Sequence, residues 1–299
     1  MMKIPIIRIP FLTEDKEFIS SNIANVLDTG YLTMGGYTKK FEDLFRKFTG
    51  AKHALATSNC TSAIEIIIRS LGIEGKSIIV PTNTFLATAL AVMHSGNKII
   101  FADSDPRTFC LDPNDIKNKI NRDTRAIILV HIGGIITPDY EKIKKICDEN
   151  DIYLIEDCAH AHGCSINGMS AGTLGIAGAF SFFPTKTLVT GEGGIITTND
   201  DKLYKKASMI RNHGKNPNME NKISEFGYNY RISEITAVIG VQQMQKAEHI
   251  ISERRKIAGW YGELLSKVDH VSPLEIPDNI ISTYYKYIIN LSEEYNCAK

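Results

Sequence analysis

The sequence predicts an α/β protein with a mainly parallel sheet flanked by helices. From about residue 53 onward, short β-branched runs alternate with segments of helical periodicity. The strand-like runs are apolar throughout, which indicates strands buried on both faces of a sheet. The helical segments between them have the length that right-handed crossovers between parallel strands need. A chain of 299 residues also favours a large core with a smaller attached unit.

Five strands and three helices are predicted in this first part of the chain. The strands are expected at residues 53–57, 77–81, 98–103, 125–130 and 152–157. The helices are expected at residues 61–72, 84–96 and 139–150. Gly72 and Gly96 close the first two helices, because glycine readily adopts the left-handed conformation that ends many helices.

The carboxyl-terminal part predicts a second, smaller unit. A long helical stretch begins at about Arg231, and residues 273–291 then resemble a linker followed by one aromatic strand. A single strand makes a poor domain. We therefore divide the chain into residues 1–240, a large domain that includes the amino-terminal segment, and residues 241–299, a long connecting helix with a truncated, incomplete small domain.

Composition and charge argue against several classes of protein. Lys+Arg and Asp+Glu both total 34, so no overall field attracts nucleic acid or anionic lipid. No run of 18 apolar residues predicts a membrane span, and the start, MMKIPIIRIPF, lacks the pattern of a signal peptide. The cysteines show no paired CxxC spacing and favour reduced thiols in a cytoplasm; they are Cys60, Cys110, Cys147, Cys158, Cys164 and Cys297.

Polar residues follow four of the predicted strands. Residues 58–62 come after the first strand and residues 82–85 after the second. His131 follows the fourth strand, and Asp157 ends the fifth, with His160 three residues beyond. Because ligands of parallel α/β sheets bind beyond the carboxyl ends of the strands, we expect these residues to share one rim.

Asp157 and Lys186 carry the main chemical prediction. An aspartate at a strand end can keep a proton on a heteroaromatic nitrogen, as pyridoxal phosphate (PLP) requires, although helix capping is about as common for such an acid. Lys186 follows 29 residues later, and a desolvated lysine amine can form a Schiff base with an aldehyde. A solvated loop lysine is the commoner alternative. Its neighbours argue against that alternative, because aromatic residues that look buried precede it and a glycine cluster that lets backbone approach a ligand follows it; they are Phe180, Phe182, Phe183, Gly191, Gly193 and Gly194.

A phosphate site is predicted at the turn SNCTSA, residues 58–63. The turn leads into a helix and offers backbone N–H groups, hydroxyls and a favourable dipole, with Thr61 and Ser62 as its foremost members. Ser181 adds a hydroxyl from the strand before Lys186. Ordinary N-capping is the alternative for the first two residues, and a bond to strand backbone is the alternative for Ser181.

Phe85 and His160 complete the candidate site. Phe85 follows a strand and can cover a flat ring by stacking, although such a residue more often belongs to the core. His160 can hydrogen-bond the phenolic oxygen of the cofactor or pack on its face. A supporting or helix-capping histidine is the alternative.

Five motifs in one order carry a resemblance to a known family. They are SNCTSAIEI, PTNTFLATA, IEDCAHAHG, FSFFPTKTLVTGEGG and GYNYRISEITAVIGVQQ. With them the chain resembles the DegT/DnrJ/EryC1/StrS sugar aminotransferases from about residue 5 to about residue 270. The resemblance implies a fold-type-I PLP enzyme whose large domain binds the cofactor.

The resemblance also implies roles around the cofactor. Lys186 forms the Schiff base with PLP and shuttles protons, Asp157 pairs with the pyridinium nitrogen, and Phe85 stacks on the ring. His160 lies beside the cofactor. The hydroxyls that contact the phosphate are those of Thr61, Ser62 and Ser181.

A homodimer with shared active sites is implied as well. In this family the GYNYR loop, residues 227–231, reaches into the neighbouring subunit. Asn229 would then bind the phosphate held by the partner subunit, and Arg231 would lie near the substrate there.

The implied reaction moves an amino group from L-glutamate to a nucleotide-linked keto-deoxy sugar, for amino-sugar or surface polysaccharide biosynthesis. Lys186 serves as both acid and base in the two halves of the reaction. Some relatives carry histidine in place of this lysine and perform dehydration, so Lys186 favours transamination.

Two other functions share parts of this pattern. A PLP-dependent lyase or desulfurase would keep Asp157 and Lys186 and would need a mobile reactive cysteine; Cys158 and Cys164 are close in sequence, although Cys158 is more simply a small buried residue. The family usually continues for some tens of residues past the last strand, so a non-catalytic regulatory or binding homologue is the second alternative. The intact Lys186 and the glycine cluster argue against it.

Overall fold

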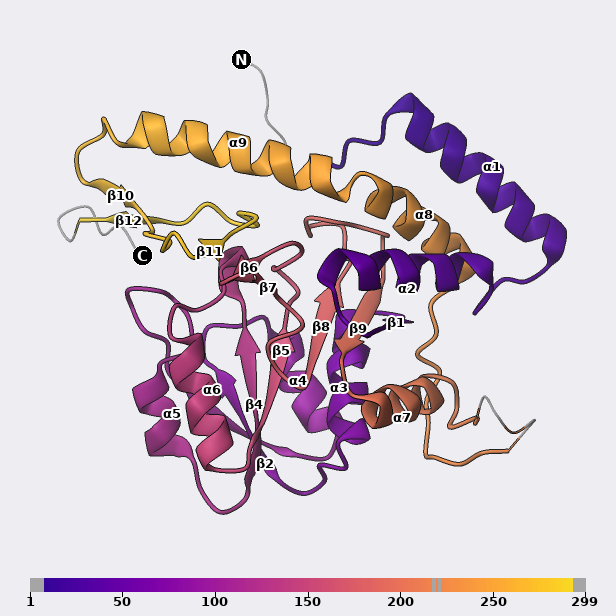
Figure 1. Ribbon diagram of the computed structural model, residues 1–299, viewed down its shortest axis with the longest axis horizontal. Helices are drawn as coiled ribbons and strands as arrows, with labels where there is room; N and C mark the ends of the chain where they lie inside the picture. The colour runs from indigo at the N-terminus through magenta and orange to yellow at the C-terminus, as the bar shows by residue number, and fades with distance from the viewer. Residues whose placement is uncertain (1–7, 217–218, 220–221, 293–299) are drawn as a thin grey trace.

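The computed structural model describes residues 8–216, 219 and 222–292, and a seven-stranded sheet forms its centre (Figure 1). The strands are β1 His53–Thr57, β2 Ser77–Pro81, β3 Lys98–Ala102, β4 Thr124–Val130, β5 Tyr153–Asp157, β8 Ala177–Ser181 and β9 Gly194–Thr198. Their order in the sheet is β1-β9-β8-β5-β4-β2-β3. Every neighbouring pair from β8 to β3 is parallel, and β9 is antiparallel to both β1 and β8. The mainly parallel sheet predicted from the sequence is therefore confirmed, with one antiparallel strand inserted.

Apolar side chains cover both faces of the sheet, because successive residues of a strand point to opposite sides. In β4, Ile127 and Leu129 belong to one buried cluster, whereas Ala126 and Ile128 belong to the other. The apolar runs that predicted the strands thus correspond to two cores, one on each face of the sheet.

Helices complete a layer on each side of the sheet. The helices α2 (Gly36–Thr49), α5 (Pro113–Lys119), α6 (Tyr140–Glu149) and α8 (Glu234–Gln245) contribute to one core, on what we call the α2 face. The helices α3 (Cys60–Ser70), α4 (Leu86–His94) and α7 (Asp201–Arg211) contribute to the other, on the α3 face. The three helices predicted from the sequence correspond to α3, α4 and α6.

The long helix predicted from about Arg231 is instead two helices. Helix α8 ends at Gln245, and α9 (Ala247–Leu265) begins after Lys246, whose backbone (φ −109°, ψ 4°) is not helical. Most residues of α8 are buried, and the helix contacts α2 and α1 (Thr13–Thr29), whereas α9 is largely exposed. Lys246 Nζ lies 2.5 Å from the carboxylate of Asp15 on α1, so a contact with a distant helix accompanies the break.

The single aromatic strand expected near the carboxyl end is also corrected. Strand β10 (Val271–Pro273) pairs with β12 (Ile289–Leu291). Strand β11 (Ile280–Ile281) pairs with β6 (Ser165–Ile166), which pairs in turn with β7 (Met169–Ser170). These pairings are short, and β11 joins β6 across more than 100 positions of sequence; they lie below α9 in the view of Figure 1.

Residues 282–288, which we call the C-terminal segment, have no regular strand structure and are fastened beside residues 133–134. The Ser282 hydroxyl donates to the Gly134 carbonyl at 2.7 Å, and the Lys286 N–H donates to the Gly133 carbonyl at 3.0 Å. Arg254 of α9 donates from Nη2 to the carbonyls of Tyr284 and Tyr285 at 2.8 and 3.1 Å. The segment is therefore held on both sides by hydrogen bonds.

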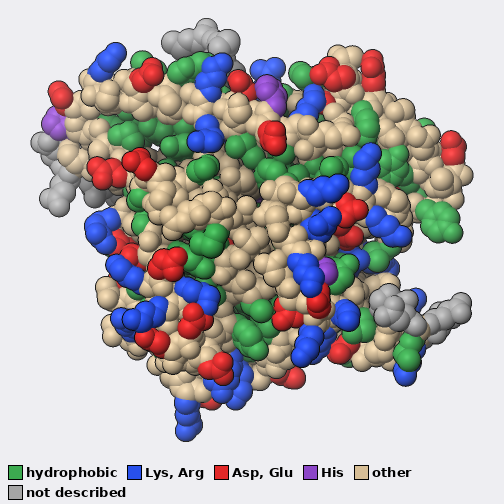
Figure 2. All heavy atoms as spheres, viewed as in Figure 1, with side chains coloured by type: hydrophobic (Ala, Val, Ile, Leu, Met, Phe, Trp, Pro, Cys, Tyr) green, Lys and Arg blue, Asp and Glu red, His purple; other side chains and the backbone are tan. Residues whose placement is uncertain are grey.

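The surface and the thiols agree with the composition. Figure 2 shows basic and acidic side chains intermixed over one face, as the equal totals of the two signs suggest. None of the helices in the described ranges combines the length and the apolar character that a bilayer crossing requires. Five cysteines are free thiols, whereas Cys297, like residues 1–7, lies outside the described residues.

Gly194 sets how closely β9 approaches the start of α3. It pairs with Thr57 of β1 and with Ser181 of β8, at the carboxyl edge of the parallel strands. A Cβ atom added at this position would overlap the carbonyl group of Asn59 and lie 2.6 Å from Thr57 Oγ1. The first turn of α3 can therefore keep its place only if residue 194 has no side chain.

Gly194→Ala is expected to lower the free energy of unfolding by roughly 2–4 kcal/mol, because backbone must move to admit the methyl group. Gly259→Ala on α9 is the matched control, since nothing lies within 4 Å of an added Cβ there. That variant should be neutral or gain up to about 1 kcal/mol from helix propensity. Urea unfolding of the two variants measures the difference, and equal stabilities would contradict the close approach.

Candidate functional site

A cavity of about 800 Å³ opens at the carboxyl edge of the sheet. It is bordered by residues from α3, the start of α4, the ends of β5 and β8 and the loop that follows β8. The structure brings six of the predicted site residues to this cavity: Thr61, Phe85, Asp157, His160, Ser181 and Lys186.

Asp157 is the last residue of β5, and it is only 5% exposed. Its Oδ2 atom accepts a hydrogen bond from the Thr88 hydroxyl at 2.7 Å. Its Oδ1 atom accepts one from the Ala159 N–H at 3.0 Å, which is the local turn bond of a capping acid. The same carboxylate thus caps a turn and borders the cavity, and its role toward a cofactor stays a prediction.

Lys186 lies half-buried in the loop after β8. No carboxylate in residues 8–216, 219 or 222–292 forms an ion pair with it, and its Nζ lies 5.1 Å from the centroid of the Tyr285 ring. The buried aromatic neighbours predicted for it are only partly correct. Phe180 and Phe182 are fully buried, whereas Phe183 is 44% exposed and borders the cavity.

His160 forms a wall of the cavity by stacking on Tyr285, with ring centroids 4.1 Å apart and planes at 19°. Its Nδ1 accepts a hydrogen bond from the Gly133 N–H at 3.3 Å, so the neutral ring carries its proton on Nε2. Burial, together with the charges of Lys186 and Lys286, lowers the pKa of His160 to about 3. The imidazole is therefore uncharged near neutral pH.

The hydroxyls of Thr61 and Ser62, which were both expected to contact a phosphate, lie in different surroundings in the first turn of α3. Asn59 is the N-cap, and its side chain accepts a hydrogen bond from the Ser62 N–H at 2.8 Å. Thr61 borders the cavity. Ser62 does not: it is 3% exposed, and its hydroxyl donates to the Asn59 carbonyl at 2.8 Å. Local capping thus explains Ser62 better than a ligand contact does.

Asn229 and Arg231 do not border the cavity of their own chain. Arg231 Nη1 donates to Asn212 Oδ1 at 2.8 Å, and Asn229 forms a β-bridge with Asn212. Their expected role in a partner subunit stays a prediction.

Sequence patterns missed several residues that border the cavity, among them Thr88, Tyr285 and Lys286. The Tyr285 hydroxyl donates to Thr185 Oγ1 at 3.3 Å, across 100 positions of sequence. The only local signal was the aromatic run STYYKY, which predicted a strand. Lys286 also borders a second cavity, of about 440 Å³, between α9 and the C-terminal segment.

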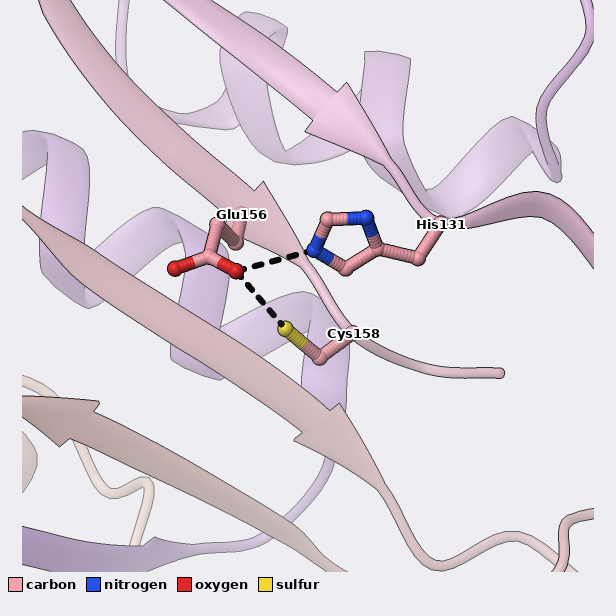
Figure 3. Close-up of side chains that lie close together, drawn as sticks. All are labelled: His131, Glu156 and Cys158. Carbon is pink, nitrogen blue, oxygen red and sulfur yellow. Dashed lines mark hydrogen bonds and ion pairs between the residues drawn. The ribbon is translucent and has the colours of Figure 1, made fainter. Parts of the chain in front are cut away.

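His131, Glu156 and Cys158 form a buried cluster behind the site (Figure 3). These residue types can bind a metal ion. However, Glu156 Oε1 already accepts the backbone N–H groups of residues 174 and 175, and Oε2 accepts that of residue 172 together with His131 Nε2, all at 2.8 Å. With both oxygens engaged, the cluster fixes the loop after β7 to the end of β5.

Comparisons with known proteins agree with one family. Residues 13–299 match the model of the DegT/DnrJ/EryC1/StrS aminotransferase family. The chain is 34% identical over 274 residues to a GDP-perosamine synthase of Caulobacter vibrioides, covering 91% of this chain and 74% of that protein. It is 34% identical over 277 residues to a dTDP-3-amino-3,6-dideoxy-alpha-D-galactopyranose transaminase of Aneurinibacillus thermoaerophilus, covering 92% and 75%. The solved aminotransferase from Psychrobacter cryohalolentis superposes with a TM-score of 0.89 at 28% identity, covering 96% of this chain and 77% of that one.

His162 lies beneath the site, in ring contact with Phe45, Phe180 and Phe182. Within the described part of the chain neither ring nitrogen has a hydrogen bond of good geometry, although the Ser181 backbone lies near enough to oppose the pKa shift slightly. Burial, reinforced by the charge of Lys186, lowers the pKa of His162 to about 3. Because an unfolded histidine has a pKa of about 6.5, the unfolded chain binds the proton more readily, and stability is lost as the pH falls through this window.

Acidification from pH 7 to pH 4 is expected to cost roughly 3 kcal/mol of folding stability through His162 alone. His162→Leu should remove this contribution and give a shallower dependence of the free energy of unfolding on pH. His249→Leu is the control, because His249 is exposed on α9. Urea unfolding at several pH values compares the three proteins, and identical pH slopes for wild type and His162→Leu would refute the buried neutral state.

Proposed function

This chain belongs to the DegT/DnrJ/EryC1/StrS aminotransferase family, and on that basis we propose that it uses PLP to move an amino group from L-glutamate to a nucleotide-linked keto-deoxy sugar. The named relatives, a GDP-perosamine synthase and a dTDP-linked amino sugar transaminase, support this class of acceptor. The aminated sugar would serve amino-sugar or surface polysaccharide biosynthesis.

The convergence of Asp157 and Lys186 on one cavity carries the proposal. Asp157 ends β5, Lys186 lies in the loop that follows the neighbouring strand β8, and both residues border the cavity. A carboxylate and a primary amine at one sheet edge are the two groups that PLP chemistry requires.

The residues of the cavity fit PLP. When bound, PLP supplies a conjugated ring that takes up the electron pair of a bond broken at the substrate α-carbon. Asp157 would hold the proton on the ring nitrogen. The first turn of α3, with the hydroxyls of Thr61 and Ser181, would hold the phosphate, and Phe85, which is 67% exposed at the cavity, would cover the ring.

Lys186 and His160 would act on the substrate side of the cavity. Lys186 Nζ, which has no ion-pair partner among the residues described, is available to bond the aldehyde carbon and then to move a proton at the substrate carbon. His160 is neutral and offers an Nε2–H donor without adding a positive charge beside the lysine. Its donor fits the phenolic oxygen of the cofactor.

We further propose a homodimer in which Asn229 binds the phosphate and Arg231 contacts the substrate in the cavity of the partner subunit. Neither residue borders the cavity of its own chain. Large apolar side chains close to them in sequence are exposed, with Ile223 at 66% and Phe226 at 79%. Such exposure supports a protein–protein contact.

We also propose the division of the chain into a first part, residues 1–240, and a second part, residues 241–299. The proposed PLP contacts come from the first part, whereas Tyr285 and Lys286 bring the second part to the cavity. Because residue 240 lies within α8, we place the limit between the two parts at the helix break, Lys246.

The desulfurase alternative needs a reactive thiol, and the two candidate thiols do not suit it. Cys158 is fully buried, and burial raises its pKa well above the usual range. Cys164 is also buried, with a pKa raised by that burial to about 11, and its thiol lies 3.0 Å from the Gly134 carbonyl. Protonated, enclosed thiols are poor nucleophiles, so aminotransfer is favoured.

Lys186→Ala is expected to abolish covalent attachment of PLP and to lower 2-oxoglutarate formation from glutamate by at least about a thousandfold, because the amine that bonds the aldehyde is gone. Borohydride reduction of PLP-loaded protein followed by peptide mass spectrometry measures attachment. Lys202→Ala, on the exposed side of α7, is the control and should keep the adduct. A reducible adduct at wild-type level in Lys186→Ala would refute the assignment.

To identify the amino acceptor, UDP-, GDP- and dTDP-linked keto-deoxy sugars are each supplied with glutamate, and the masses of the products are measured. Amination of one of them is the expected result. Wild-type protein that carries PLP on Lys186 and converts glutamate, yet aminates none of the three, would contradict the proposed class of acceptor.

Shared sites predict complementation between two defective chains. A homodimer of Lys186→Ala has no lysine to bond PLP at either site. A homodimer of Asn229→Asp has at each site a carboxylate that repels the phosphate. In mixed dimers one site keeps both native residues, so random reassociation should restore up to roughly a quarter of wild-type PLP sites. Borohydride-stable PLP after mixing, compared with each variant alone, measures the gain. No gain despite exchange of subunits would contradict the shared site.

A further inference from the structure

A chain of three side chains links α4 to the end of β5. The Thr88 hydroxyl donates to Asp157 Oδ2 at 2.7 Å, and Thr84 Oγ1 lies 2.7 Å from Thr88 Oγ1. Thr88 is 1% exposed, and both threonines border the cavity. Thr88 and Asp157 are 69 positions apart, so packing of α4 against the sheet creates this contact.

The number of protons fixes the direction of the chain. A hydroxyl carries one hydrogen, and that of Thr88 is committed to Asp157. Thr88 Oγ1 must therefore accept the hydrogen of Thr84, although their distance alone leaves the donor open. The bonds run from Thr84 to Thr88 to Asp157, and in such a chain each bond strengthens the next.

The chain also fixes the orientation of the carboxylate. Asp157 Oδ1 is held by the Ala159 N–H, and Oδ2 is held by Thr88. A carboxylate bonded at both oxygens does not rotate without breaking a bond. A threonine within a helix commonly bonds back to a carbonyl of the preceding turn, whereas the hydroxyl of Thr88 points to another element.

We propose that Thr88 is a positioning residue that holds the Asp157 carboxylate in one orientation at the cavity, with Thr84 as the outer hydroxyl that supports it. The inference rests on the proposed function, because a fixed anion at this point acts on a protonated ring nitrogen. Thr88 works through Asp157, so its loss should slow the proton transfers more than it weakens substrate binding.

The test compares Thr88→Val, which keeps the shape of the side chain without the hydroxyl, with Thr88→Ser, which keeps the hydroxyl. In PLP-loaded protein mixed with glutamate alone, Thr88→Val should lower the single-turnover rate constant for 2-oxoglutarate formation roughly ten- to a hundredfold, because one hydrogen bond to a charged group is lost. The half-saturating glutamate concentration should stay within about threefold of wild type. Thr88→Ser should stay within about threefold of wild type in both quantities, and Thr84→Val should lie between.

The split between rate constant and half-saturation, together with rescue by Thr88→Ser, separates positioning from a loss of structure. An unchanged rate constant in Thr88→Val, or a Thr88→Ser variant as slow as Thr88→Val, overturns the inference. If Thr88→Val does not fold, the decision passes to Thr84→Val, where a lower rate constant with unchanged half-saturation supports the inference and an unchanged rate constant overturns it. Failure of the proposed function has a different signature, namely no borohydride-stable adduct on Lys186 of the wild type, and that result overturns both.

Discussion

The site depends on one constraint of strand geometry, which is that consecutive residues of β5 point to opposite faces of the sheet. Glu156 points to the α2 face, where backbone N–H groups and the His131 ring hold it. Asp157 must then point to the α3 face, where Thr88 meets it and the cavity opens. One strand end thus presents a carboxylate that fixes the scaffold and a carboxylate that borders the cavity. A register shift of one residue would exchange them.

Features with a local signal in the sequence could be predicted, whereas contacts between distant segments could not. Apolar runs with polar ends are local signals, so the strands, Asp157 and Lys186 were accessible. Thr88 and Tyr285 reach the cavity through contacts across 69 and 100 positions, for which no local pattern exists. Ser62 was expected beside Thr61, but capping of α3 directs its hydroxyl to the Asn59 carbonyl. The break at Lys246 was likewise invisible, because its backbone conformation goes with an ion pair to α1.

The electrostatics of the cavity are balanced by keeping the imidazole neutral. Lys186 and Lys286 border it as cations, and Asp157 and Glu192 border it as anions. A protonated His160 would add a third positive charge, and burial with the two lysines prevents that by lowering its pKa. The positive end of the α3 dipole then remains the main feature that favours an anionic group at the first turn of that helix.

The C-terminal segment forms part of the cavity wall, yet most of the bonds that fasten it end on its main chain. Lys286 is held by its N–H, and Tyr284 and Tyr285 are held by their carbonyls. Side chains at positions 284 and 286 can therefore be exchanged while the segment stays in place, whereas the Tyr285 side chain also contacts His160 and Thr185. Substitution of Lys286, which borders both cavities, would thus alter the wall of each while Asp157 and Lys186 keep their positions.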